Sequence, residues 1–302
     1  MTSAFFIAAL AATIPLAQAH FTFVRIAVND EWQAPTRYIR NKTEPYTEPS
    51  TPGQSDPFQN IRWYNFPTYA SDNPNSVRCG RDNMAHAAST ETLKVKAGDK
   101  IEMAHQRVEP SEWQDNQWYG CPDKRGTCHP EWLQDINHPG PLLVHLSAPP
   151  AGSDVRSYDG AGEWVKIHTL GLELNNSDPA APVNWLPYNY EKQPPHFVFN
   201  IPRQTPAGQY LMRVDIVWSD FYYEGVRHNS SQLYPSCVQI EVEGDSTTVL
   251  PKGVHIPEIF APDAPGMTTS QQMYNLKKLD SNFTYPGGPL WDGQKLIEDK
   301  PI

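Results

Sequence analysis

Residues 206–218 read PAGQYLMRVDIVW, the longest strand-like stretch of the chain. A turn at Pro206-Ala207-Gly208 leads into Gln209–Trp218, where β-branched and aromatic residues are concentrated. Seven other segments have the same chemistry and end near Gly, Pro, Asn or Asp residues. They are Phe21–Val28, Leu93–Lys96, Lys100–His105, Leu142–Ser147, Trp164–Thr169, Phe197–Ile201 and Val238–Glu243. The turn Ala97-Gly98-Asp99 is predicted to join two of these strands as a β-hairpin.

The fold class follows from many short strands combined with long loops at 29–78 and 107–140. No run of apolar residues at helical spacing exceeds a few turns, and 30 prolines favour loops over long helices. We predict an all-β fold, an immunoglobulin-like antiparallel β-sandwich with long loops and a C-terminal irregular extension. The expected parts are a signal peptide (1–19), a β-sandwich domain (20–244) and a Pro-rich C-terminal extension without a core of its own (245–302).

The first nineteen residues predict export. An apolar run ends in Ala17-Gln18-Ala19, a small-x-small cleavage site, and the run is too short to span a bilayer. Cleavage there would make His20 the first residue of the mature chain. We therefore expect a secreted, extracellular protein, and nothing after the signal reads as a membrane anchor.

Cysteines and sequons agree with an oxidising compartment. Four cysteines allow three pairings, and their spacing resembles no zinc finger. Cys121 and Cys128 flank a short loop that they would close, in which case Cys79 and Cys237 would join distant segments. Four Asn-x-Ser/Thr sequences are candidate glycosylation acceptors. They are Asn41, Asn175, Asn229 and Asn282.

The charge narrows the possible partners. A formal net charge of −10 argues against a nucleic-acid partner, because the phosphate backbone favours Lys and Arg. We expect a monomer that binds neither nucleic acid nor membrane.

A free N-terminal His20 would offer a metal two nitrogens that an internal histidine cannot offer together. These are its α-amino group, whose unperturbed pKa is roughly 7.7–8.0, and its ring Nδ1. A second histidine would complete a planar set of three nitrogens, which suits copper(II). An N-terminal histidine can also be an accident of signal cleavage.

His138 is the best candidate for the second histidine. It lies in Asn137-His138-Pro139-Gly140-Pro141, directly before a predicted strand, and a rigid turn there would fix a ligand in space. His145 lies within that strand and is expected to be a sheet side chain. The remaining candidates are most simply surface or core residues. They are His86, His105, His129, His168, His196, His228 and His255.

The third element is Gln232-Leu233-Tyr234-Pro235-Ser236-Cys237. Gln232 and Tyr234 are two residues apart, so an extended backbone would point both to one face. A tyrosine over a copper plane would block one axial position, and a glutamine could hydrogen-bond bound oxygen. The alternative is a core tyrosine beside a disulfide, which is common in sandwiches.

Together, an N-terminal histidine, His-x-Gly-Pro before a strand and Gln-x-Tyr-Pro-x-Cys resemble the fungal lytic polysaccharide monooxygenases. The resemblance covers His20 to about Gly244 and implies that His20 and His138 bind one copper ion. It also implies that Tyr234 is axial and that Gln232 lies beside it. An external electron donor and O2 or H2O2 would be co-substrates, and hydroxylation beside a glycosidic bond would break an insoluble polysaccharide.

Two families of these enzymes share the pattern. The order of motifs and the placement of Cys79 and Cys237 match the cellulose-active family nine. The residues themselves are more similar to auxiliary-activity family fourteen, which is associated with xylan on wood fibres. This resemblance implies plant cell-wall xylan associated with cellulose as the substrate. The matching stretches are HFTFVRI (20–26), YIRNK (38–42), VRCGRDNMAH (77–86), GEWVKI (162–167) and PAGQYL (206–211). Family nine places a histidine several residues before the glutamine, whereas here Trp218–Val226 occupies that region and His228 is the nearest.

Other functions and contacts stay open. A cellulose-active monooxygenase and a non-catalytic copper-binding protein are the alternatives, whereas scattered acids give no carboxylate pair for hydrolysis. Aromatic residues of the long loops are candidates for stacking on sugars, although such residues are as often buried. They are Trp32, Tyr38, Trp63, Tyr64, Tyr69, Trp113, Trp118 and Tyr119.

Overall fold

The computed structural model describes residues 22–42, 67–106, 138–175, 177, 179–187, 197–227 and 231–301. The predicted signal peptide, His20 and the Cys121–Cys128 pair lie outside these residues. Among the described residues, no helix combines the length and the apolar character needed to cross a membrane.

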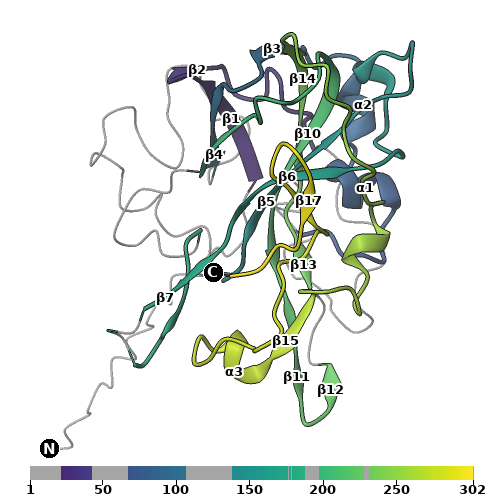
Figure 1. Cartoon of the computed structure of the whole chain (residues 1–302). Coiled ribbons are helices and arrows are strands. Elements are labelled where there is room, and N and C mark those ends of the chain that lie inside the picture. Colours follow the sequence, from purple (N-terminus) through teal and green to yellow (C-terminus); the bar gives the residue numbers. More distant parts are fainter. Residues whose placement is uncertain are drawn as a thin grey trace, which may run out of the picture.

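Two sheets form the body of the molecule (Figure 1). The smaller has the strand order β2 (Glu31–Trp32), β1 (Thr22–Val28), β4 (Lys100–Gln106) and β9 (Phe197–Asn200). The larger has the order β17 (Leu296–Ile297), β16 (Leu290–Trp291), β6 (Val165–Leu170), β5 (Leu142–Ser147), β10 (Gly208–Trp218), β14 (Ser236–Glu243) and β3 (Leu93–Lys96). A short strand, β13 (Gln232–Leu233), also pairs with β10. The predicted β-sandwich is confirmed.

The main core lies between the two sheets. Along β10, alternate side chains enter different clusters because successive residues of a strand point to opposite faces. Met212 and Val214 join the main core, whereas Leu211 and Val217 join a second cluster on the outer face of the larger sheet. Every one of these four side chains is fully buried. Strand β10 is therefore covered on both faces, which explains why it reads as a nearly continuous apolar run.

Short helical elements cover that outer face. Helix α1 (Pro74–Cys79) begins with an Asn73 cap and a proline in its first turn, both of which favour a helix start. Helix α2 (Asn83–Ala87) and the 3₁₀ turns η4 (Val155–Ser157) and η5 (Glu258–Phe260) lie alongside. A disulfide joins Cys79 at the end of α1 to Cys237 in β14. This confirms one of the two predicted pairings.

The C-terminal segment packs against the sandwich. It contributes β16 and β17 to the larger sheet. It also contains β15 (Thr268–Ser270) and α3 (Gln271–Tyr274), which lie outside that sheet. Strand β15 pairs with β11 (Asp220–Tyr223), whose other neighbour is β12 (Val226–Arg227). Met273, Phe283 and Tyr285 share a third apolar cluster with the hairpin β7 (Leu172–Leu174) and β8 (Val183–Trp185). The segment is thus richer in structure than the irregular extension expected, although its apolar residues are buried jointly with the sandwich.

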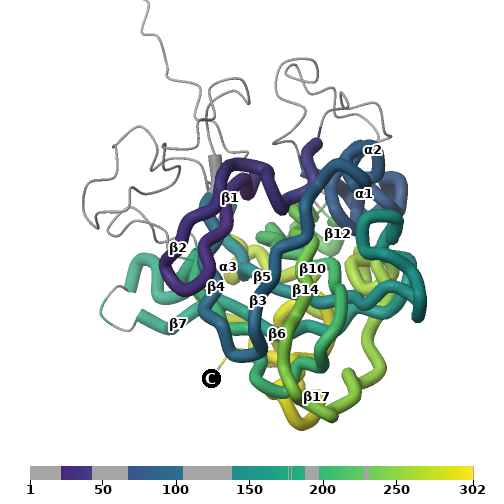
Figure 2. Tube along the Cα trace, turned by 90° about the horizontal axis from the view of Figure 1, so that it is seen from above, coloured from purple at the N-terminus to yellow at the C-terminus, as the bar shows by residue number. Residues whose placement is uncertain are grey.

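All eight predicted strands are present, with ends displaced by no more than two residues. The predicted hairpin at Ala97-Gly98-Asp99 is wrong. Strand β3 pairs in parallel with β14, whereas β4 pairs with β1 and β9 in the other sheet. The turn instead crosses between sheets, because the Ala97 N–H donates to Glu243 of one sheet and the Gly98 N–H donates to Ile201, just after β9 of the other. Figure 2 shows β1, β2 and β4 grouped together, with β3 lying toward β14.

A half-buried histidine predicts how stability responds to acid. Burial lowers the pKa of His168, in β6, to about 4 despite the opposing effect of Asp299. The unfolded histidine titrates near 6.5, so between pH 6.5 and 4 the unfolded chain binds a proton that the folded chain does not. Stability should therefore fall as pH decreases through this window, by up to about 1.4 kcal/mol per pH unit from this group.

A His168→Phe variant should reduce that acid sensitivity, because it keeps a ring against Phe199, on which His168 is stacked. Urea unfolding of both proteins at pH 6.5, 5.5 and 4.5 measures the difference. The exposed His255, changed to Gln, serves as the control and should leave the pH dependence as it is. Equal pH slopes for wild type and His168→Phe would contradict the assignment.

Candidate metal site

His138 is held at the start of β5 by a tight contact with β10. The Val217 N–H donates to the Pro141 carbonyl over 3.1 Å, and Leu142 then pairs with Ile216. A Cβ atom on Gly140 would lie 1.9 Å from the Val217 carbonyl oxygen, so only glycine allows this approach. The Pro-Gly-Pro turn therefore fixes His138 beside the end of β10, which agrees with the rigid turn expected from the sequence.

Trp218, the last residue of β10, packs on the imidazole of His138. The two ring centroids are 3.8 Å apart and the planes are inclined by 8°. Both side chains are half-buried. From the sequence, Trp218 was expected to end a strand and to belong to the segment that departs from the family-nine pattern, but it was not expected to contact the site. Its position could have identified Trp218 as a site residue. It is a large aromatic residue at the end of the strand that the His138 turn contacts.

Gln232 and Tyr234 lie near His138 as well. The Tyr234 hydroxyl donates to Oε1 of Gln232 over 2.6 Å, which confirms that the two side chains share a face. The Tyr234 ring centroid is 6.2 Å from that of His138, and Gln232 is paired with Trp218 between β13 and β10. Three motifs that are distant in the sequence thus meet at one end of the larger sheet.

The other described histidines have different surroundings. His145 is fully buried, its Nε2–H donates to the Gly287 carbonyl over 2.9 Å, and its ring meets Phe260 edge-on. Burial, reinforced by Arg213, lowers the pKa of His145 well below its usual value. It is therefore a sheet side chain, as predicted. His129, His196 and His228 lie outside the described residues, as does the side chain of His105.

The donor chemistry around His138 fits copper. Among the described residues, no three His, Cys, Asp or Glu side chains gather as a metal cluster. The predicted donor set needs a single imidazole from this part of the chain, because His20 would supply the amine and the second ring nitrogen. Neutral imidazole is a copper ligand, and the neighbouring phenol and amide add no charge that would oppose reduction of the metal. His20 itself lies outside the described residues.

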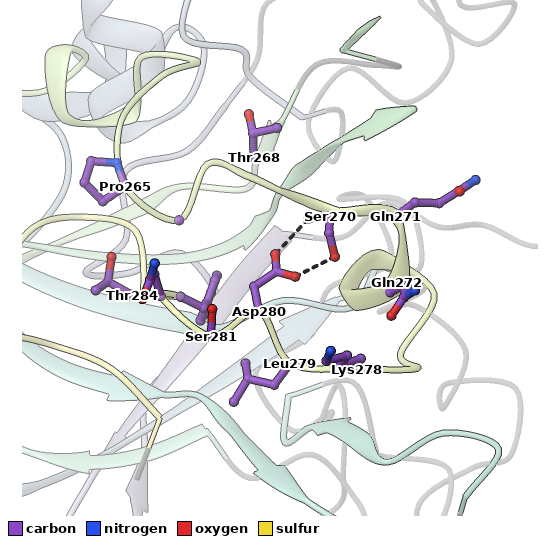
Figure 3. A pocket seen from close by; sticks show the side chains of 13 residues that line it. Pro265, Thr268, Ser270, Gln271, Gln272, Lys278, Leu279, Asp280, Ser281 and Thr284 are labelled. Carbon is purple, nitrogen blue, oxygen red and sulfur yellow. Dashed lines mark hydrogen bonds between the residues drawn. The ribbon is translucent and has the colours of Figure 1, made fainter. Parts of the chain in front are cut away.

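The C-terminal segment reaches this site through α3. The ring of Tyr274 is 5.6 Å from that of Trp218 and 4.0 Å from that of Phe221. Ser270 caps α3, and its N–H and hydroxyl both donate to Asp280, over 2.8 and 2.5 Å (Figure 3). Ser270 and Asp280 are among the residues that line a pocket of about 660 Å³. For the candidate site, the consequence of the Ser270–Asp280 bonds is that they fix the start of α3, the helix that carries Tyr274.

Some predicted contact residues are placed and others are not. Tyr38 and Tyr69 are buried, so they are core residues, and Trp32 is half-buried beneath the Arg25 guanidinium. The other aromatic candidates lie outside the described residues. Of the candidate glycosylation acceptors, Asn282 is exposed and Asn41 and Asn175 are half-buried, whereas Asn229 lies outside the described residues.

The matching family model and relatives assign the chain to the class of copper-dependent polysaccharide monooxygenases. The family model of Auxiliary Activity family 9 (formerly GH61) matches residues 20–283, and the chain belongs to this family. Enzymes of this family use one copper ion, an external reductant and O2 or H2O2. The comparisons do not support the finer resemblance to family fourteen.

Relatives span nearly the whole chain. AA9 family lytic polysaccharide monooxygenase G of Aspergillus tamarii is 28% identical over 285 residues, covering 94% of this chain and 69% of the relative. Monooxygenase U of Thermothielavioides terrestris is 28% identical over 291 residues, covering 94% of this chain and 96% of the relative. Among solved structures, CvAA9A superposes with a TM-score of 0.60 at 19% identity, covering 91% of this chain and all of that one. Cel61B from Hypocrea jecorina gives a TM-score of 0.56 at 17% identity, covering 90% and 100%. These structures support the fold.

Proposed function

We propose that the secreted enzyme begins at His20, holds one copper ion with His20 and His138, and oxidatively cleaves cellulose in plant cell walls. The observation that carries this proposal is the meeting of His138, Trp218 and the Tyr234–Gln232 pair at one end of the larger sheet. Sequence distance separates these residues, so their convergence supports a site more strongly than any one motif.

The residues have distinct roles in this proposal. Stacking on Trp218 limits the rotation of the His138 ring, which fixes the direction of its ligand nitrogen. Tyr234 would lie next to a metal bound by His138, and its hydroxyl is held by Gln232. When bound, copper supplies the one-electron chemistry by which O2 or H2O2 hydroxylates a carbon beside the glycosidic bond.

Cellulose is the substrate best supported by family membership. One solved structure at 20% identity is titled a cellulose-active polysaccharide monooxygenase from M. thermophila. Xylan laid on cellulose remains the second substrate, on the strength of the sequence stretches shared with family fourteen. Secretion is supported by the apolar N-terminal run and the Cys79–Cys237 disulfide.

The test compares two forms of the enzyme, one beginning at His20 and one with a single glycine added before it. The glycine moves the free amine away from the His20 ring, so copper affinity should fall at least about 100-fold. N-terminal mass spectrometry verifies each form, and copper titration with electron paramagnetic resonance measures the binding.

The same two forms are then incubated with ascorbate and either pure cellulose or xylan-coated cellulose. Oxidised oligosaccharides from the His20 form alone are the expected result, and the substrate that yields them identifies the preference. Equal copper binding by both forms would refute the ligand assignment. Tight binding without oxidised products on any glycan would identify a copper carrier.

A further inference from the structure

The strand ladder on one side of β10 is interrupted at Tyr234. Leu233, the end of β13, pairs with Val217, and Ser236, the start of β14, pairs with Val214. Tyr234 and Pro235 fall between these two pairings, and proline has no N–H to donate. The Tyr234 peptide therefore needs a hydrogen-bond acceptor from outside the ladder, because an unsatisfied buried N–H is costly.

A side chain provides that acceptor. Oδ1 of Asp215, on β10, accepts the Tyr234 N–H over 2.5 Å. The other carboxylate oxygen accepts from Nη2 of Arg213 over 2.7 Å, and neither side chain of this pair is exposed. Arg213 and Asp215 are two residues apart on one strand, so they project from the same face of the sheet.

Arg213 is fixed in turn by α1. Its Nε donates to the Arg78 carbonyl over 2.8 Å and its Nη2 also donates to the Val77 carbonyl over 3.2 Å. Its guanidinium carbon lies 4.7 Å from the centroid of the Phe260 ring. Four groups thus surround the Arg213 guanidinium. Because Asp215 accepts from this guanidinium and from the Tyr234 N–H, the Tyr234 peptide is bonded to a fixed carboxylate.

We propose that Asp215, held by Arg213, is a positioning residue for Tyr234. The Tyr234 side chain is 1% exposed, so its direction follows from its peptide and from the packing around it. By accepting the Tyr234 N–H, Asp215 sets the phenol against Gln232 and opposite His138. This inference rests on the proposed function, because only a bound copper ion gives the phenol position a chemical consequence.

The first test uses the metal-free enzyme. In Asp215→Ala the Tyr234 amide loses its acceptor, so its hydrogen exchange should become about ten-fold faster. The second test uses copper-loaded Asp215→Ala and electron paramagnetic resonance. Its parallel g value and copper hyperfine splitting should differ from those of copper-loaded wild type. Asp215→Asn, which keeps the size and removes the charge, should show both changes in smaller measure and serves if the alanine variant does not fold.

A matched control separates positioning from general destabilisation. Asp299 forms a comparably buried pair with Lys166 over 2.6 Å and contacts none of His138, Tyr234 or Gln232 in the described structure. Asp299→Asn should lower stability to urea while leaving Tyr234 exchange and the copper spectrum unchanged. Wild-type exchange and spectrum in both Asp215 variants, or an equal spectral change in Asp299→Asn, would overturn the inference. A wild-type enzyme without a three-nitrogen copper spectrum would instead refute the proposed function, and the metal-free exchange would still report on Asp215.

Discussion

A His138→Ala variant should bind copper at least about 100-fold more weakly than wild type and should release no oxidised oligosaccharides from cellulose. Groups that merely hydrogen-bond to metal ligands typically cost 10–100-fold in affinity when removed, so loss of a ligand should exceed that range. The Gly140 contact and the Trp218 stack fix the position of His138, so alanine at this position would remove an imidazole that the fold holds in place. Isothermal titration with copper(II) and product analysis by mass spectrometry measure the two effects.

The same variant should remain folded. His138 is half-buried, and a stacked aromatic pair contributes roughly 0.5–1.5 kcal/mol, so urea unfolding of the metal-free variant should lose no more than that. His255→Ala, which removes an exposed histidine, is the control and should bind copper as wild type does. Unchanged copper affinity in His138→Ala, with a three-nitrogen spectrum, would mean that another histidine is the ligand.

The long strands were predictable because their signal is local. Strands such as β5 and β10 are covered on both faces, so their β-branched and aromatic residues stand out between turn residues. Strands β2, β12, β13, β16 and β17 are two residues long and depend on a partner already in place. Their sequences carry no periodic pattern, and no reasoning from local composition could have found them.

The hairpin prediction at Ala97-Gly98-Asp99 was also wrong because strand pairing depends on distant partners. A Gly-Asp turn between two alternating segments is an ordinary hairpin signal. Which strand each segment pairs with is decided by packing, and here both segments find longer partners in opposite sheets. The turn was correctly located, whereas its topology could not be predicted from the turn itself.

Some residues of the candidate site could be predicted from the sequence, and others could not. His138, Gln232 and Tyr234 were predicted because rigid turns and a two-residue spacing leave a trace in the sequence. Trp218 and Asp215 were not, since one acts through a ring contact and the other through a peptide hydrogen bond across strands. Residues of this second kind contact the predicted site residues, and only the folded arrangement identifies them.

Removing the Cys79–Cys237 disulfide should be among the most destabilising changes that leave the metal ligands intact. The bond closes a loop with a sequence separation of 158, for which the loop-entropy relation gives about 5 kcal/mol, against roughly 2–4 kcal/mol in typical measurements. It also anchors α1 to β14 three residues after Tyr234, beside the carbonyls that hold Arg213. We expect Cys79→Ala/Cys237→Ala to unfold about 2–5 kcal/mol more easily in urea.

The second predicted disulfide offers a comparison within the same chain. Cys121 and Cys128 are seven positions apart, so the same relation assigns their loop only about 2.5 kcal/mol. Cys121→Ala/Cys128→Ala should therefore cost roughly half as much as the long-range pair, with an unchanged copper spectrum. Because Cys79 and Cys237 are fully buried, part of the loss in their double variant is lost packing. Measuring Cys121→Ala/Cys128→Ala with and without reductant isolates the effect of the Cys79–Cys237 cross-link. Equal costs for the two pairs would show that chain entropy is not what the long-range disulfide contributes.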